Sequence, residues 1–128
     1  MNRDKLRELI NTVIDKTVSG LLEWEKMHEQ DAYRASLGEV SLLMSKGGLH
    51  GGSTYGKDWV RFTLADRRGD VIHVWNVIQE RDYDDVDTAQ NSPEYNWALE
   101  AWEIARSSAM EAGQKIEDAL DFLSKLKS

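Results

Sequence analysis

The sequence contains no cysteine and only one proline among its 128 residues. Without cysteine, the chain has no disulfide framework, no thiolate zinc site and no cysteine nucleophile. Basic residues are also scarce: 16 of them stand against 23 acidic ones, a formal net charge of −7, which argues against binding nucleic acid by neutralising phosphates. No apolar run reaches the roughly 18 residues of a membrane span, and the N-terminus does not resemble a signal peptide. We therefore expect a cytoplasmic protein that does not associate with membranes.

The composition is that of a globular protein, with 41% hydrophobic and 30% charged residues. A chain of this length corresponds to one domain, here residues 1–128, and it can bury a core without disulfides. Its hydrophobic patterning predicts an α+β fold, with an N-terminal helix, a four-stranded antiparallel meander and a long C-terminal helix.

The first segment, residues 2–19, carries apolar side chains at three- and four-residue steps, the pattern of an amphipathic helix. Asn2 is a suitable N-cap, and Gly20 stands where a left-handed residue ends a helix. The stripe consists of Leu6, Leu9, Ile10, Val13, Ile14 and Val18. After the helix, the charged stretch 23–30 indicates a packed connection anchored by Trp24.

Four short strands are predicted between this connection and the C-terminal helix. Residues 32–37 and 39–45 are separated by Gly38, and the second segment alternates apolar and polar side chains as a half-buried strand does. Residues 57–78 form the clearest hairpin, because two alternating segments flank a glycine-containing turn.

The turn at residues 66–69 sets the expected register of this hairpin. Counting outward places Phe62 opposite Val74 and Leu64 opposite Ile72. One sheet face would then carry Trp59, Arg61, His73 and Trp75. Arg61 could stack on an indole there. Either a helix covers this face, or it is open and is the best ligand- or partner-binding candidate in the chain.

The C-terminal segment reads as a helix from Pro93 to Leu126, because proline is favoured at a first helical position. Its apolar residues alternate steps of three and four like a heptad seam. Such a helix would be about 50 Å long, far more than a small domain can cover. It either breaks near Gly113, which the glycine favours, or projects toward a partner. In both cases the seam needs a facing surface, and we predict self-association through Trp102, Ala105, Ala109, Ala112 and Ile116.

The glycine-rich segment 51–57 resembles a phosphate-binding loop, but it fails that pattern at Asp58 and leads into a strand rather than a helix. As a long loop containing His50 and Tyr55, it remains a candidate lid over a ligand.

No metal or cofactor site is predicted. The acidic run Asp82, Asp84, Asp85 and Asp87 does not meet the calcium-loop template, and the three histidines are dispersed. We interpret the run as a solvated linker, or else as a negative patch that meets a basic partner.

The order of elements resembles a recurrent kind of small bacterial and phage-encoded protein, in which a helix precedes a β-meander and an Ala/Arg-containing C-terminal helix. The likeness is carried by Trp24, the turn at 66–69, Trp102, Ala105, Arg106 and Ala109. It implies an α+β fold and a prokaryotic or phage source, and it brings no activity or catalytic residue with it.

The leading functional prediction is a non-enzymatic interaction protein, acting on a protein partner or on itself as a homo-oligomer such as a homodimer. It would be a small acidic regulatory or inhibitory factor encoded by a phage or mobile element. The alternative is a small-ligand binder, for a nucleotide-like molecule, that uses the aromatic and arginine face of the sheet with the glycine-rich loop as a lid.

Overall fold

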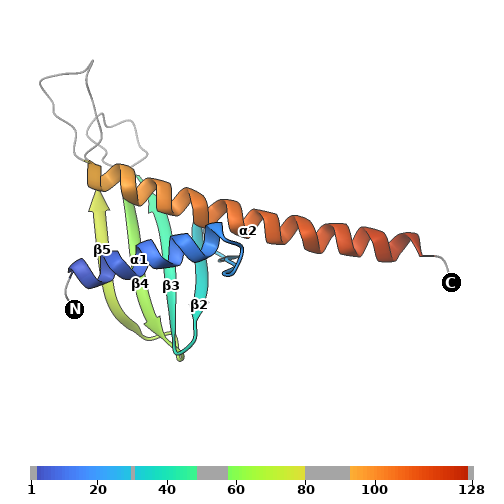
Figure 1. The fold of residues 1–128 in the computed structure, drawn as a ribbon, viewed down its shortest axis with the longest axis horizontal. Helices are drawn as coiled ribbons and strands as arrows, with labels where there is room; N and C mark the ends of the chain where they lie inside the picture. Colours follow the sequence, from blue (N-terminus) through green and yellow to red (C-terminus); the bar gives the residue numbers. More distant parts are fainter. Residues whose placement is uncertain (1–2, 30, 49–57, 80–92, 127–128) are drawn as a thin grey trace, which may run out of the picture.

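The computed structural model describes residues 3–29, 31–48, 58–79 and 93–126. In these residues the chain forms two helices and a five-stranded antiparallel sheet with neighbouring strands in sequence order (Figure 1). The predicted α+β architecture is thus confirmed, with one strand more than expected. The elements are α1 (Arg3–Val18), β1 (Glu25–Lys26), β2 (Ala32–Leu37), β3 (Val40–Gly47), β4 (Trp59–Asp66), β5 (Val71–Ile78) and α2 (Pro93–Lys125).

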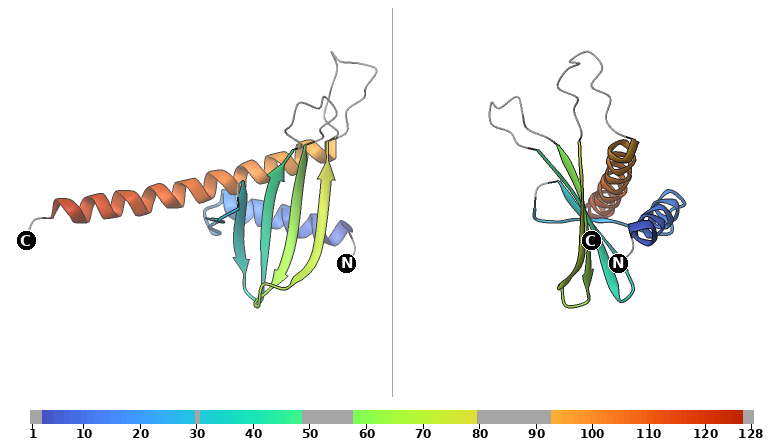
Figure 2. Two further views of the ribbon diagram at one scale, coloured as in Figure 1. Left: turned by 180° about the vertical axis from the view of Figure 1, so that it is seen from behind. Right: turned by 90° about the vertical axis from the view of Figure 1, so that its left-hand side faces the viewer.

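The two helices lie on the same face of the sheet, and neither of them covers the other face (Figure 2). Helix α2 crosses the strands from β5 toward β2, and α1 lies beside it. The core fills the space between this helical layer and the sheet, with Ile10, Leu42 and Ala98 fully enclosed. One sheet covered on one side by two helices is therefore the body of the protein.

Helix α1 follows its predicted stripe, with Leu6, Ile10 and Val13 buried. Gly20 ends it in the left-handed conformation, at φ 77°. The amide of Leu21 donates to the carbonyl of Lys16 at 2.9 Å, and the Gly20 amide donates to Thr17, the paired bonds of a Schellman motif. The predicted end of this helix is confirmed.

The additional strand is β1, which lies in the segment expected to be only a packed connection. Glu25 is paired with Arg34 and Lys26 with Tyr33, and the side chains of Glu25 and Arg34 form an ion pair. Two residues are too few to show a period-two pattern, so this strand could not be predicted from the spacing of apolar residues. It extends the sheet at its β2 edge.

The predicted register of the β4–β5 hairpin is wrong by one residue. The turn forms as expected, with Gly69 at φ 87°, but an irregularity follows between Leu64 and Ala65. As a result Phe62 is opposite Trp75 rather than Val74. The shift moves Trp75 to the helix-covered face, where it is 5% exposed, and burial of this large side chain favours the shifted register.

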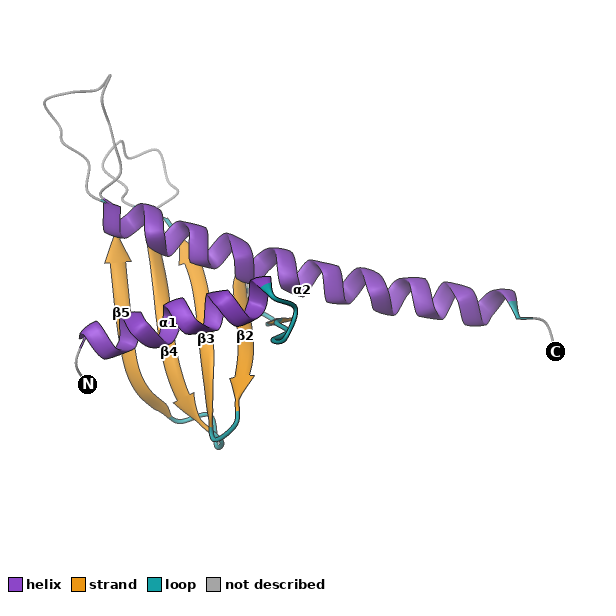
Figure 3. Cartoon of the chain, in the orientation of Figure 1, coloured by secondary structure: helices purple, strands orange, loops and turns teal. Residues whose placement is uncertain are grey.

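Helix α2 is continuous and does not break near Gly113, contrary to the favoured prediction. Gly113 is exposed, and no side chain crowds it to force a bend. With 33 residues the helix is about 50 Å long. A five-stranded sheet is only about 20 Å wide at 4.8 Å between strands, so α2 extends well beyond it (Figure 3).

Candidate interaction surface

The projecting half of α2, with the residue that follows it, carries a set of large apolar side chains that are exposed in the described part of the chain. Each is between 59% and 64% exposed. They are Ile116, Leu120, Phe122, Leu123 and Leu126. We call these five residues, together with Ala112 and Ala119, the distal stripe. An apolar strip of this extent on a monomer is a mark of an interaction site.

The distal stripe continues the line of residues by which α2 packs on its own sheet. Ala98, Ala105 and Ala109 are buried against the body. Steps of three and four residues then lead through Ala112, which is half-buried, to the fully projecting Ile116. The same face of α2 therefore packs on the sheet in the first half of the helix and is exposed to solvent in the second half.

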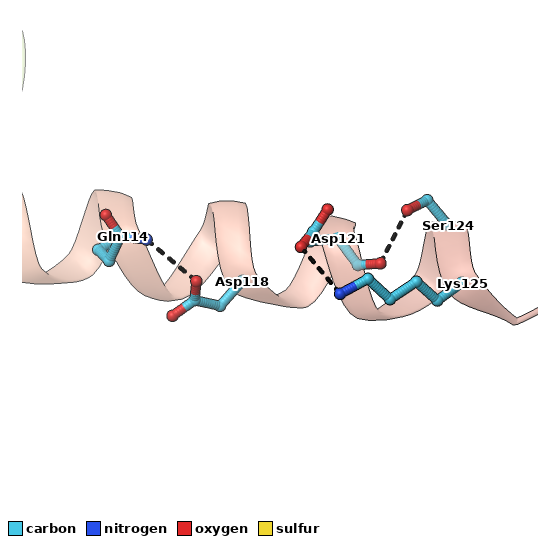
Figure 4. A network of polar contacts seen from close by, with 5 residues as sticks. All are labelled: Gln114, Asp118, Asp121, Ser124 and Lys125. Atoms are coloured by element: carbon cyan, nitrogen blue, oxygen red, sulfur yellow. Dashed lines mark hydrogen bonds and ion pairs between the residues drawn. The ribbon is translucent and has the colours of Figure 1, made fainter.

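The other face of the projecting half is polar, and its side chains form hydrogen bonds and an ion pair with one another (Figure 4). Gln114 Nε2 donates to Asp118 Oδ1 at 3.0 Å. Lys125 Nζ lies 3.4 Å from Asp121 Oδ2, one turn earlier. These contacts between residues four apart support the helix and keep its solvent face polar, so the distal stripe is the side available to a partner.

A groove of about 500 Å³ lies at the root of the projection, between the end of α1 and the middle of α2. Apolar residues form part of its wall: Val18, Leu22, Ile104 and Ala112. The acidic side chains around it are Glu23, Glu100, Glu103 and Glu111, with Lys115 at the distal end. Val18 and the neighbouring Leu21 are 71% and 74% exposed, so the end of α1 also presents apolar surface.

The structure divides the predicted self-association residues into two groups. Trp102, Ala105 and Ala109 are buried by the body of the same chain, so they are not available to a second one. Trp102 packs against Tyr33 with ring centroids 5.9 Å apart. Ile116 is exposed and Ala112 half-buried. The exposed residues Leu120 and Phe122 were missed, because neither falls on the alternating three- and four-residue steps that define the seam.

The predicted aromatic face of the sheet is split by the register shift. Trp59 and Arg61 are on the uncovered face, where the Arg61 guanidinium lies 4.6 Å from the Trp59 ring centroid. This confirms the expected stacking of Arg61 on an indole. Arg61 Nε also donates to Asn76 Oδ1 at 2.7 Å, and the Trp59 ring lies so close to Gly47 that a Cβ there would collide with it. The pair is held in a defined orientation.

His73 and Trp75 lie on the opposite face, so the four-residue platform expected from the sequence does not exist. His73 is in register with Leu64 on the helix-covered side. Trp75 packs between Phe62 and Trp97, with ring centroids 5.7 Å and 5.5 Å away. Its role is in the core.

Comparison of the chain with protein-family models, with curated proteins and with solved structures gives no match. Assignment of function therefore depends on the geometry described above.

The other tryptophans of α2 and of the segment after α1 lie in the core and at the contact between the helices. Trp24 is buried and its indole N–H donates to Thr17 Oγ1 at 2.9 Å. Trp97 is half-buried, and its Nε1 donates to Asn11 Oδ1 on α1. Arg7 lies 4.7 Å from the Trp97 ring centroid, so α1 and α2 are joined by polar as well as apolar contacts.

The predicted lid residues His50 and Tyr55, and the acidic run from Asp82 to Asp87, lie outside the described residues. Among the described residues, no cluster of three or more His, Asp and Glu side chains is placed to hold a metal ion. Neither described helix is both long and apolar enough to cross a membrane.

Proposed function

We propose that this protein is a non-enzymatic interaction factor that self-associates through the projecting half of α2. The observation that carries the proposal is the distal stripe, whose five large apolar side chains are all more than half exposed. Full burial of one such side chain stabilises by about 1.5–3 kcal/mol. Covering the stripe is therefore strongly favourable for any partner that fits it.

The helical state of the projecting half supports the same proposal. Isolated helices of about 15 residues are marginal in water, because most helix stability in proteins comes from packing of an apolar face. Residues 113–126 are all exposed and lack such packing, although the stripe that would provide it is present. A docked partner would supply the missing contacts.

The factor would act in the cytoplasm of a prokaryotic or phage-infected cell, as a regulatory or inhibitory protein without catalysis. Its net charge of −7 would favour encounter with a basic regulatory target. The projecting helix and the acidic groove would be its two contact surfaces.

Light scattering after size-exclusion chromatography tests self-association. We expect a mass that rises toward twice that of the monomer between about 5 and 500 µM, the range around a micromolar dissociation constant. Ile116→Lys should hold the protein monomeric by placing a charge in the stripe. Glu117→Gln changes the charge by the same amount on the polar face and should leave the dimer intact. A monomer over the whole concentration range would overturn the proposal.

A second candidate, binding of a nucleotide-like ligand, is favoured by the exposed stack of Arg61 on Trp59. Base stacking on an aromatic side chain contributes about 1–3 kcal/mol. Titration with a nucleotide panel should then change tryptophan fluorescence, and Trp59→Phe should remove most of the change. A response unaltered by that substitution would contradict this candidate.

A further inference from the structure

We propose that the partner on the distal stripe is a second copy of this chain in antiparallel orientation, with residues 109–126 of the two α2 helices overlapping. The proposal rests on the proposed self-association and adds the direction and register of the two helices. Each helix tip would end at the groove beside the other copy's α1.

The direction follows from what the same face of α2 contacts in the first half of the helix. Ala98 and Ala105 are fully buried, so the space in front of that face is filled by the protein's own sheet. A parallel partner would bring its own α2 alongside, stripe to stripe, into this occupied space. An antiparallel partner instead extends beyond the distal end of α2, so the two bodies would lie at opposite ends of the paired helices.

The register is limited by where the stripe becomes accessible. The tip residue Leu126 of the partner can reach as far as Ala109, which is 8% exposed and marks the edge of the body. One heptad further inward, it would meet Trp102, which is covered by the sheet. One heptad further outward, Ala112 would remain uncovered.

In this register three large residues of the distal stripe face alanines. Leu126 is opposite the partner's Ala109, Leu123 is opposite the partner's Ala112, and Ile116 is opposite the partner's Ala119. The two-fold symmetry repeats each pair. Alternation of large and small side chains across facing positions lets two helices interdigitate closely. A parallel pair would instead place alanine against alanine and leucine against leucine.

The groove at the root of the projection lies where the partner's tip arrives. Ala112 belongs both to the groove wall and to the overlap, and Val18 and Ile104 line the same groove. The tip carries Leu123 and Leu126, each about 60% exposed. The end of α1, with exposed Val18 and Leu21, would therefore be covered by the same partner that covers the distal stripe.

The overlap is large enough for a weak but specific dimer. Residues 109–126 extend over about 27 Å of helix. Five large side chains from each copy, with the groove contacts, would bury on the order of 1,000 Å² in total, the lower limit for a specific interface. We therefore expect micromolar association.

Cysteine crosslinking tests the arrangement, because the chain has no cysteine of its own. Ala112→Cys and Leu123→Cys are expected to form a disulfide-linked dimer when the two variants are mixed and oxidised. Each variant alone should give none, since in the antiparallel register identical positions lie more than about 15 Å apart. A mixture of Ala112→Cys with Asp121→Cys, whose cysteine lies on the polar face, is the matched control.

The outcomes separate this inference from the proposed function. A covalent dimer from Ala112→Cys alone would indicate parallel helices and overturn the inference while leaving self-association in place. A linked product from Ile116→Cys with Leu126→Cys, but not from the first mixture, would overturn the register. A strict monomer by light scattering, with no linked product, would overturn both proposals.

Discussion

The indole N–H of Trp102 donates a hydrogen bond to the backbone carbonyl of Asp31 at 2.9 Å, joining α2 to the start of β2. Asp31 adopts a left-handed conformation at φ 58°, and its carbonyl also accepts the amide of Lys46 on β3. The contact therefore ties α2 to the part of the sheet where the helix leaves the body. Beyond this anchor the helix still packs on the body as far as Ala109, and the residues after Ala112 are exposed.

Trp102→Phe should lower the free energy of unfolding by about 1–2 kcal/mol, since it removes this hydrogen bond and part of the buried ring. Trp102→Ala should cost about 3–5 kcal/mol because it also leaves a cavity against Tyr33. Urea denaturation of the two variants measures the difference. Equal stability of Trp102→Phe and the wild type would show that the bond does not contribute.

Thr17→Val should destabilise the protein by about 1–3 kcal/mol. The hydroxyl of Thr17 accepts the indole N–H of the buried Trp24, so the isosteric valine leaves that donor without a partner. Thr17→Ser keeps the oxygen and should stay much closer to the wild type. If the serine and valine variants unfold at the same urea concentration, the hydrogen bond is not the source of the effect.

The stability of Trp75 and Trp59 variants distinguishes the observed register from the one expected from the sequence. Trp75→Ala should cost about 3–5 kcal/mol, because it opens a cavity between Phe62 and Trp97. Trp59→Ala removes an exposed contact with Arg61 and should cost about 0.5–1 kcal/mol. A smaller loss for Trp75→Ala than for Trp59→Ala would favour the unshifted hairpin.

This hairpin also shows where prediction from sequence reaches its limit. The helix periodicity and the end of α1 at Gly20 are local properties, and both were predicted correctly. The register of β5 depends on one extra residue near Ile72, which is favoured by burial of Trp75 under helices that are distant in sequence. A two-residue strand such as β1 gives no periodic signal at all.

The candidate site could be predicted only in part, and the reason is similar. The seam of α2 is evident from its spacing, but spacing does not tell which half of the seam packs within the chain. That depends on the width of the sheet, about 20 Å, relative to a helix of about 50 Å. The structure assigns Ala105 and Ala109 to the body and leaves Ile116 and Leu123 exposed.

Gly113→Ala should stabilise the projecting half of α2. Gly113 is helical, does not have a positive φ, and a Cβ built there meets nothing within 4 Å. Replacing glycine by alanine inside a helix contributes about 1 kcal/mol, visible as greater helicity by circular dichroism and slower amide exchange in residues 110–116. The control is Gly38→Ala, which should destabilise because Gly38 has φ 81°. A loss of helicity in the Gly113 variant would indicate a bend at this position.

Amide hydrogen exchange in residues 112–126 should slow as the protein concentration rises, because pairing of the distal stripe protects a helix that is otherwise marginal. Leu123→Glu should abolish the concentration dependence and weaken association at least tenfold, equivalent to about 1.4 kcal/mol. The adjacent Ser124→Glu introduces the same charge on the polar face, where Ser124 Oγ donates to the carbonyl of Asp121, and it should retain the dependence. If exchange in this segment is independent of concentration in the wild type, the stripe is not an interface between copies of this chain.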